Sequence, residues 1–86
     1  MATVLVSHEV EDFDKWLGSS KREEFFGPHG ITVRTFKDQK DPNRVALILE
    51  VPDPSVLPEI LATDEAAAAM KHDGVRPETL AMLEEA

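Results

Sequence analysis

The segment Arg44–Val51 constrains the fold of this chain most, because it reads as a strand that is apolar on both sides. One side carries four apolar residues, Val45, Leu47, Leu49 and Val51. The other side carries Ala46 and Ile48. An antiparallel sheet with one face in water alternates apolar and polar residues, so this strand predicts a sheet that is buried on both faces.

The chain that must bury this strand is short, with 86 residues and no cysteine. A domain of this size buries only about 60–65% of the surface that its unfolded chain exposes. Neither a disulfide nor a thiolate zinc site can stabilise it, and small chains without such staples often depend on oligomerisation. We therefore expect a single domain over residues 1–86 that pairs with a second copy of itself.

The charge balance excludes several classes of partner. Seventeen acidic residues face nine basic ones, for a net charge of −8. A nucleic-acid partner requires a basic stripe, and an anionic membrane surface attracts basic segments. The N-terminus has no basic region followed by a long apolar run, and no stretch approaches the roughly 18 apolar residues of a membrane span. The sequence predicts a cytoplasmic protein with no nucleic-acid or membrane partner.

The remaining elements follow from hydrophobic spacing and from glycine and proline. Five segments are expected: a strand over Thr3–Val10, a helix capped by Glu11 or Asp12 that runs to about Phe25, strands over Ile31–Lys37 and Arg44–Val51, and a helix over Ser55–His72. Thr63 offers a fresh cap inside the last helix, and Gly74 suits its end.

The tail, Glu78–Ala86, is ambiguous from its residues. Its composition favours a helix, whereas its alternation also suits a buried strand. If it is a strand, the order βαββαβ gives the ferredoxin-like arrangement, an α+β fold with a four-stranded antiparallel sheet and both helices on one face. Nothing else in the chain can cover the second apolar face, so a two-fold copy is the simplest cover.

Three stretches resemble a known family. They are Val6–Trp16, which reads V-x-H-x-V-x-D-F-x-x-W; Asp41–Val45, which reads D-P-N-x-V; and Ala69–Val75, which reads A-M-x-x-x-G-V. They resemble small proteins of the dimeric α/β-barrel superfamily described as antibiotic-biosynthesis-monooxygenase-like. The resemblance implies a ferredoxin-like protomer that forms a barrel with its two-fold mate, and a fourth strand around Thr79–Glu84. It also implies a ligand cavity between the helices and the sheet.

Members of that superfamily include cofactor-free monooxygenases, small isomerases and cyclases, haem enzymes and proteins of no known activity, so the fold does not choose among functions. This chain departs from the better-known monooxygenases because it has no tyrosine. The connection Phe25–Gly30 is also unusual beside typical members.

Eight residues are candidates for a site. His8, on the side of the first strand with Val4 and Val6, is the candidate general base. Arg22 and Arg34 are candidates to stabilise a developing oxyanion. The predicted substrate-binding residues are Phe13, Trp16, Phe36, Met70 and His72. For each of them a purely structural role is the alternative.

The three histidines lie on three different elements without a short ligand spacing, so we expect no metal site, and no haem or other cofactor motif occurs. No phosphate loop, nucleophile elbow or paired carboxylates point to a nucleotide enzyme or a hydrolase. Two functions remain. One is a small cofactor-independent enzyme that oxygenates, isomerises or cyclises a hydrophobic aromatic or polyketide-like substrate. The other is a non-catalytic dimeric ligand-binding or structural protein.

Overall fold

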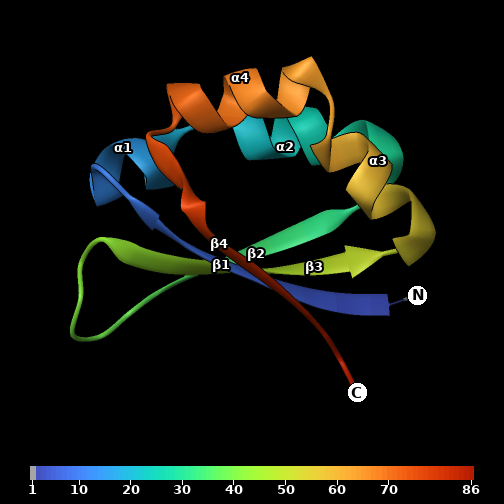
Figure 1. Ribbon diagram of the computed structural model, residues 1–86, viewed down its shortest axis with the longest axis horizontal. Coiled ribbons are helices and arrows are strands. Elements are labelled where there is room, and N and C mark those ends of the chain that lie inside the picture. Colours follow the sequence, from blue (N-terminus) through green and yellow to red (C-terminus); the bar gives the residue numbers. More distant parts are fainter. Residues whose placement is uncertain (1) are drawn as a thin grey trace.

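The computed structural model describes residues 2–86. Four strands, four α-helices and two short 3₁₀ turns follow one another along these residues (Figure 1). In chain order they are β1 (Ala2–Val10), α1 (Phe13–Gly18), α2 (Lys21–Phe26), η1 (Gly27–His29), β2 (Thr32–Lys37), β3 (Arg44–Val51), η2 (Pro54–Val56), α3 (Leu57–Leu61), α4 (Asp64–His72) and β4 (Val75–Glu84).

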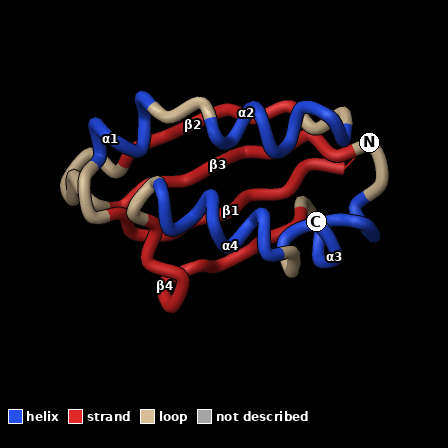
Figure 2. The backbone as a smooth tube through the Cα atoms, turned by 90° about the horizontal axis from the view of Figure 1, so that it is seen from above, coloured by secondary structure: helices blue, strands red, loops and turns tan. Residues whose placement is uncertain are grey.

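The strands form one antiparallel sheet in the order β2-β3-β1-β4, and the helices cover one of its faces. Figure 2 shows α1 and α2 on the β2 side of the sheet and α4 on the β4 side. This is the ferredoxin-like α+β fold that the order of elements predicted.

Each predicted helix is interrupted. Asp12 caps α1 by accepting a hydrogen bond from the Lys15 amide, but the expected continuous helix to about Phe25 is wrong, because the chain leaves helical geometry at Ser19. The second helix divides at Thr63, whose hydroxyl accepts from the Ala66 amide and begins α4. Serine and threonine compete with helix geometry in this way, since their side chains bond to the backbone.

The tail is a strand, as topology predicted and helix propensity did not. β4 pairs with β1, but the register shifts between Ser7 and Glu9. Pro77 lies within this part of β4 and has no N–H to contribute to the ladder. The Thr79 hydroxyl accepts a hydrogen bond of 2.8 Å from the Glu9 amide, so this amide is paired although the ladder is irregular here. His8 therefore lies beside the irregular part of the sheet.

The core lies between the sheet and the helices. Its strand residues alternate along β1 and β3, and its helix residues come from α1, α2 and α3. The buried members are Val4, Val6, Val10, Val45, Leu47, Leu49 and Val51 from the strands, with Trp16, Phe26, Ile31, Leu57 and Ile60. Within residues 2–86 no helix has the length and apolar character needed to cross a membrane.

Candidate functional site

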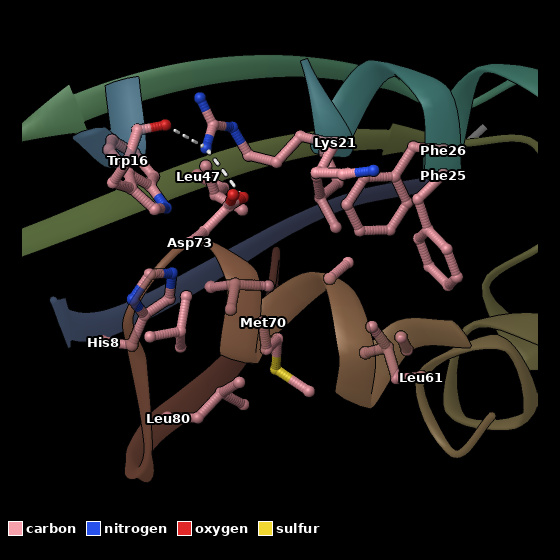
Figure 3. Close-up of a pocket in the computed structure, with 16 residues that line it drawn as sticks. His8, Trp16, Lys21, Phe25, Phe26, Leu47, Leu61, Met70, Asp73 and Leu80 are labelled. Atoms are coloured by element: carbon pink, nitrogen blue, oxygen red, sulfur yellow. Dashed lines mark hydrogen bonds and ion pairs between the residues drawn. The ribbon is translucent and has the colours of Figure 1, made fainter. Parts of the chain in front are cut away.

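A cavity of about 70 Å³ lies within this core, between the helices and the sheet (Figure 3). Strands β1 and β3 form its floor, α2 and α4 line its sides, and β4 contributes Val75 and Leu80. Its lining is mostly apolar, and Lys21 lies at one end. His8 and Asp73 lie near Trp16 at the opposite end (Figure 3). Arg22 joins them there, because its Cζ lies 4.1 Å from the centroid of the Trp16 ring and its Nη1 3.8 Å from the Asp73 carboxylate.

His8 lines the cavity from β1 and is 5% exposed. Its Nδ1 atom is 3.3 Å from the carbonyl oxygen of Glu9. A carbonyl can only accept a hydrogen bond, so Nδ1 carries the proton and Nε2 has the lone pair. Within residues 2–86, no group makes a hydrogen bond to Nε2. The imidazole therefore presents a basic nitrogen that its neighbours leave open.

The surroundings keep His8 uncharged. Burial is the main cause that lowers the pKa of His8 from its ordinary 6.5, the bond to Glu9 opposes it, and the positive charge of Arg22 adds to it. Trp16 packs its ring edge-on against the imidazole, with 5.8 Å between the centroids. At neutral pH His8 is thus available as a proton acceptor.

Arg22 reaches the cavity from α2 and is held by α1. Its Nη1 donates a 2.8 Å hydrogen bond to the Trp16 carbonyl, and its Cζ lies 4.1 Å from the centroid of the Trp16 ring. Burial lowers the pKa of Arg22, which the negative charge of Asp73 partly offsets. A guanidinium stays protonated in proteins, so the cavity wall keeps one fixed positive charge.

Asp73 is the residue that sequence reasoning missed. It is 3% exposed, and its carboxylate lies 3.8 Å from Arg22 Nη1 and 2.9 Å from His72 Nδ1. Gly74, at φ +71°, turns the chain from α4 into β4 and fixes the place of Asp73. An acid between the end of a helix and a glycine resembles ordinary capping, so only the fold reveals that it pairs with α2.

The structure brings together four of the eight predicted site residues, which are His8, Arg22, Trp16 and Met70. Phe13 does not line the cavity but supports it, because it packs against Trp16 at 6.1 Å between ring centroids. The His72 side chain is 56% exposed and faces a groove outside the cavity, while its Nδ1 bonds to Asp73.

Arg34 and Phe36 lie on the other face of the sheet. Arg34 pairs across β2 and β3 with Ile48, and Phe36 pairs with Ala46. The alternation of β2 directs them away from the helices, so neither shares a cavity with His8. The sequence placed both on one strand side but could not say which side the helices cover.

A groove of about 650 Å³ lies beside the cavity, between α2 and α4. The cavity and the groove share three lining residues: Lys21, Phe25 and Ala69. The outer wall of the groove adds Glu24, Pro28 and His29 on one side and Glu65, Ala68 and His72 on the other.

Solved structures share the fold of this chain over all or nearly all of its length. An antibiotic biosynthesis monooxygenase matches 100% of this chain and 97% of its own, with a TM-score of 0.64 and 18% identity. A candidate enzyme of that class from Nitrosomonas europaea has the same coverage, a TM-score of 0.68 and 14% identity. A conserved protein of unknown function from Bacteroides thetaiotaomicron, a possible oxidoreductase, matches 98% of this chain and 92% of its own, with a TM-score of 0.55 and 15% identity.

The chain has the fold of the antibiotic biosynthesis monooxygenases. No protein-family model matches its sequence, and the search of curated proteins finds no match. The fold that the resemblance implied is therefore confirmed by structure. At these identities the likeness shows the fold alone, so the chemistry must be argued from the cavity.

Proposed function

We propose that this protein is a cofactor-independent enzyme whose first step is removal of a proton from a small hydrophobic substrate by His8. The observation that carries the proposal is the imidazole at the polar end of an apolar cavity, uncharged and with Nε2 open. A base at the end of a small, mostly apolar cavity gains effectiveness because few water molecules compete for the proton or the anion.

The step requires an acidic proton, such as a C–H beside a carbonyl or a phenol O–H. Nε2 takes the proton and becomes N–H, while the electron pair stays on the substrate as an enolate or phenolate. The Arg22 guanidinium, on the same cavity wall, stabilises that negative charge. Oxygenation by molecular oxygen, isomerisation and cyclisation can each begin from such an anion.

One observation favours the alternative, a non-catalytic dimeric ligand-binding or structural protein. Arg22 already donates to the Trp16 carbonyl and lies close to Asp73. A guanidinium so engaged could serve packing alone. The two functions differ in whether removing the His8 imidazole abolishes a reaction or only changes stability.

We also propose that the protein is a homodimer that pairs through the open face of its sheet. One row across the four strands on that face consists of Arg34, Ile48, Leu5 and Leu83. Leu83 is 58% exposed, and Phe36, on the same face at the opposite edge of the sheet, is 45% exposed. A second copy would cover these apolar side chains, which a single protomer leaves in water.

Hydrogen–deuterium exchange tests the catalytic proposal. Small ketones and phenols are incubated in D₂O with the protein, and loss of the C–H signal beside the carbonyl of 2-pentanone is followed by NMR. We expect exchange above the buffer rate, reduced about 10²-fold or more by His8→Gln. Lys40→Gln is the control because Lys40 is exposed and lines neither the cavity nor the groove. Equal exchange by wild type and His8→Gln would leave the binding alternative.

A further inference from the structure

The cavity and the groove lie side by side. Lys21 and Phe25 from α2 and Ala69 from α4 line both spaces, so they are the boundary between them. Figure 3 shows Lys21 and Phe25 at one end of the cavity and His8 and Asp73 at the other. A path from the groove into the cavity would run between these three residues, and a molecule that takes it would reach His8 with its leading end.

The cavity is much smaller than the groove, so a compact substrate that fills the groove could not enter the cavity. A water needs about 10–15 Å³ on this measure, so 70 Å³ holds roughly five non-hydrogen atoms. A fused ring system is larger than that. The groove, at about 650 Å³, accommodates a substantially longer remainder.

The charges of the groove limit what that remainder can be. Lys21 pairs with Glu24 at 3.8 Å, and Glu65 adds a second carboxylate. Phe25, Pro28, Ala68 and Ala69 supply apolar surface. This lining offers no surplus positive charge for an anionic tail, and it suits an uncharged chain.

From this geometry we infer that the substrate is a linear, uncharged carbonyl compound that places a narrow carbonyl end beside His8 and its alkyl chain in the groove. The inference rests on the proposed function for the carbonyl, since His8 requires an acidic C–H. The chain itself rests on the shape of the path. A fused-ring form of the aromatic substrate considered from the sequence is larger than the cavity.

Ala69 is the specificity-determining residue of this path. It lies on α4 and lines both spaces with Lys21 and Phe25, and its side chain is a single methyl group. A leucine at this position would narrow the boundary from the α4 side. Ala67 lies on the same helix, is exposed and lines neither space, so Ala67→Leu is a matched control.

The test is an NMR titration of the ¹⁵N-labelled protein with 2-pentanone, 2-heptanone, 2-nonanone and the fused-ring ketone 2-tetralone. We expect affinity to rise about two- to fourfold for each added methylene, because each one leaves water for the groove. Ala69→Leu should weaken 2-nonanone binding at least tenfold, and Ala67→Leu should bind as the wild type does. If Ala69→Leu does not fold, Phe25→Trp narrows the same boundary from α2.

Three results would overturn the inference: affinity that does not change with chain length, binding of 2-tetralone as tight as that of 2-nonanone, or equal binding by the two leucine variants. His8→Gln separates this inference from the proposed function. It should keep the dependence on chain length while losing exchange. Wild type that binds long ketones without exchanging them refutes the base and leaves the path intact.

Discussion

The two faces of the sheet are built from the same strands but meet different surroundings. On the helix-covered face Leu49 is 0% exposed and lies within the core. On the open face its neighbour Ile48 is half-buried, and Leu83 is 58% exposed. Two adjacent residues of one strand thus lie in two different environments. The helices of the same chain cover Leu49, whereas the open face leaves apolar side chains in contact with water.

The comparison shows where polar groups are tolerated. On the open face, Glu9 pairs with Arg76 at 3.5 Å in partial contact with water. On the covered side, Asp73 and Arg22 are almost fully enclosed, and each has a hydrogen-bond partner or an ion-pair partner. On the covered side these two charged groups therefore have partners, whereas the Nε2 atom of His8 is left open.

The largest effect on stability is expected from a substitution on the helix-covered face. Leu49→Ala should lower the free energy of unfolding by about 2–5 kcal/mol, since it removes buried contacts and leaves a cavity. Ile48→Ala, measured at low protein concentration, should cost no more than about 1 kcal/mol, because that side chain packs against one layer only. Urea unfolding followed by circular dichroism measures both. Equal losses would mean that the open face is as well packed as the core.

The next effect breaks the open face. Leu5→Asp places a charge between Ile48 and Leu83, within the row on the open face and away from Arg34. If this face joins two copies, burial of an unpaired carboxylate should raise the dimer dissociation constant at least about 100-fold. Sedimentation equilibrium at micromolar concentration measures it. Glu24→Ala, on an exposed helix position, is the control. A wild-type monomer at that concentration would refute the dimer.

Much of this two-faced sheet could be predicted from the sequence. The alternation of Arg44–Val51 predicted two apolar faces, and its bounds match β3. The shared side of Val4, Val6 and His8 was also predicted, because strand periodicity is strict. The resemblance and topology together identified the fourth strand, against the helix propensity of its residues.

The site was less predictable, because its parts come from separate elements. Arg22 and Asp73 are 51 positions apart, and only the packing of α2 beside α4 brings them together. Arg34 was grouped with His8 because a strand pattern gives two sides without saying which one the helices cover. The break at Ser19 that lets Arg22 return to Trp16 was likewise not predicted, although it is local, with the Ser19 hydroxyl accepting from the Lys21 amide.

A smaller effect sharpens the contrast between enclosed and exposed ion pairs. Asp73→Asn removes the charge that faces Arg22 and should cost about 1–3 kcal/mol of unfolding free energy, since it leaves an enclosed guanidinium less well compensated. Glu24→Gln breaks the exposed pair with Lys21 and should cost less than about 0.5 kcal/mol. Chemical unfolding of the two isosteric variants gives the comparison. Equal costs would show that Asp73 contributes no more than a surface acid.

The smallest effect concerns His8 alone. Its pKa is lowered in the folded protein, mainly by burial, so the folded state binds fewer protons than the unfolded state just below the ordinary value of 6.5. Stability therefore falls as pH drops from about 6.5 toward the lowered pKa, with a limiting slope of about 1.4 kcal/mol per pH. Below the lowered pKa both states are protonated and the loss of stability stops.

His8→Gln should remove this pH-dependent part of the stability, whereas His29→Gln should keep it. Unfolding curves between pH 7.5 and 4.5 measure how much stability is lost. The ¹⁵N chemical shift of Nε2 over the same range gives the midpoint of the His8 titration. A midpoint at or above 6.5 would mean that the imidazole is hydrated, and the covered face would then hold no dry base.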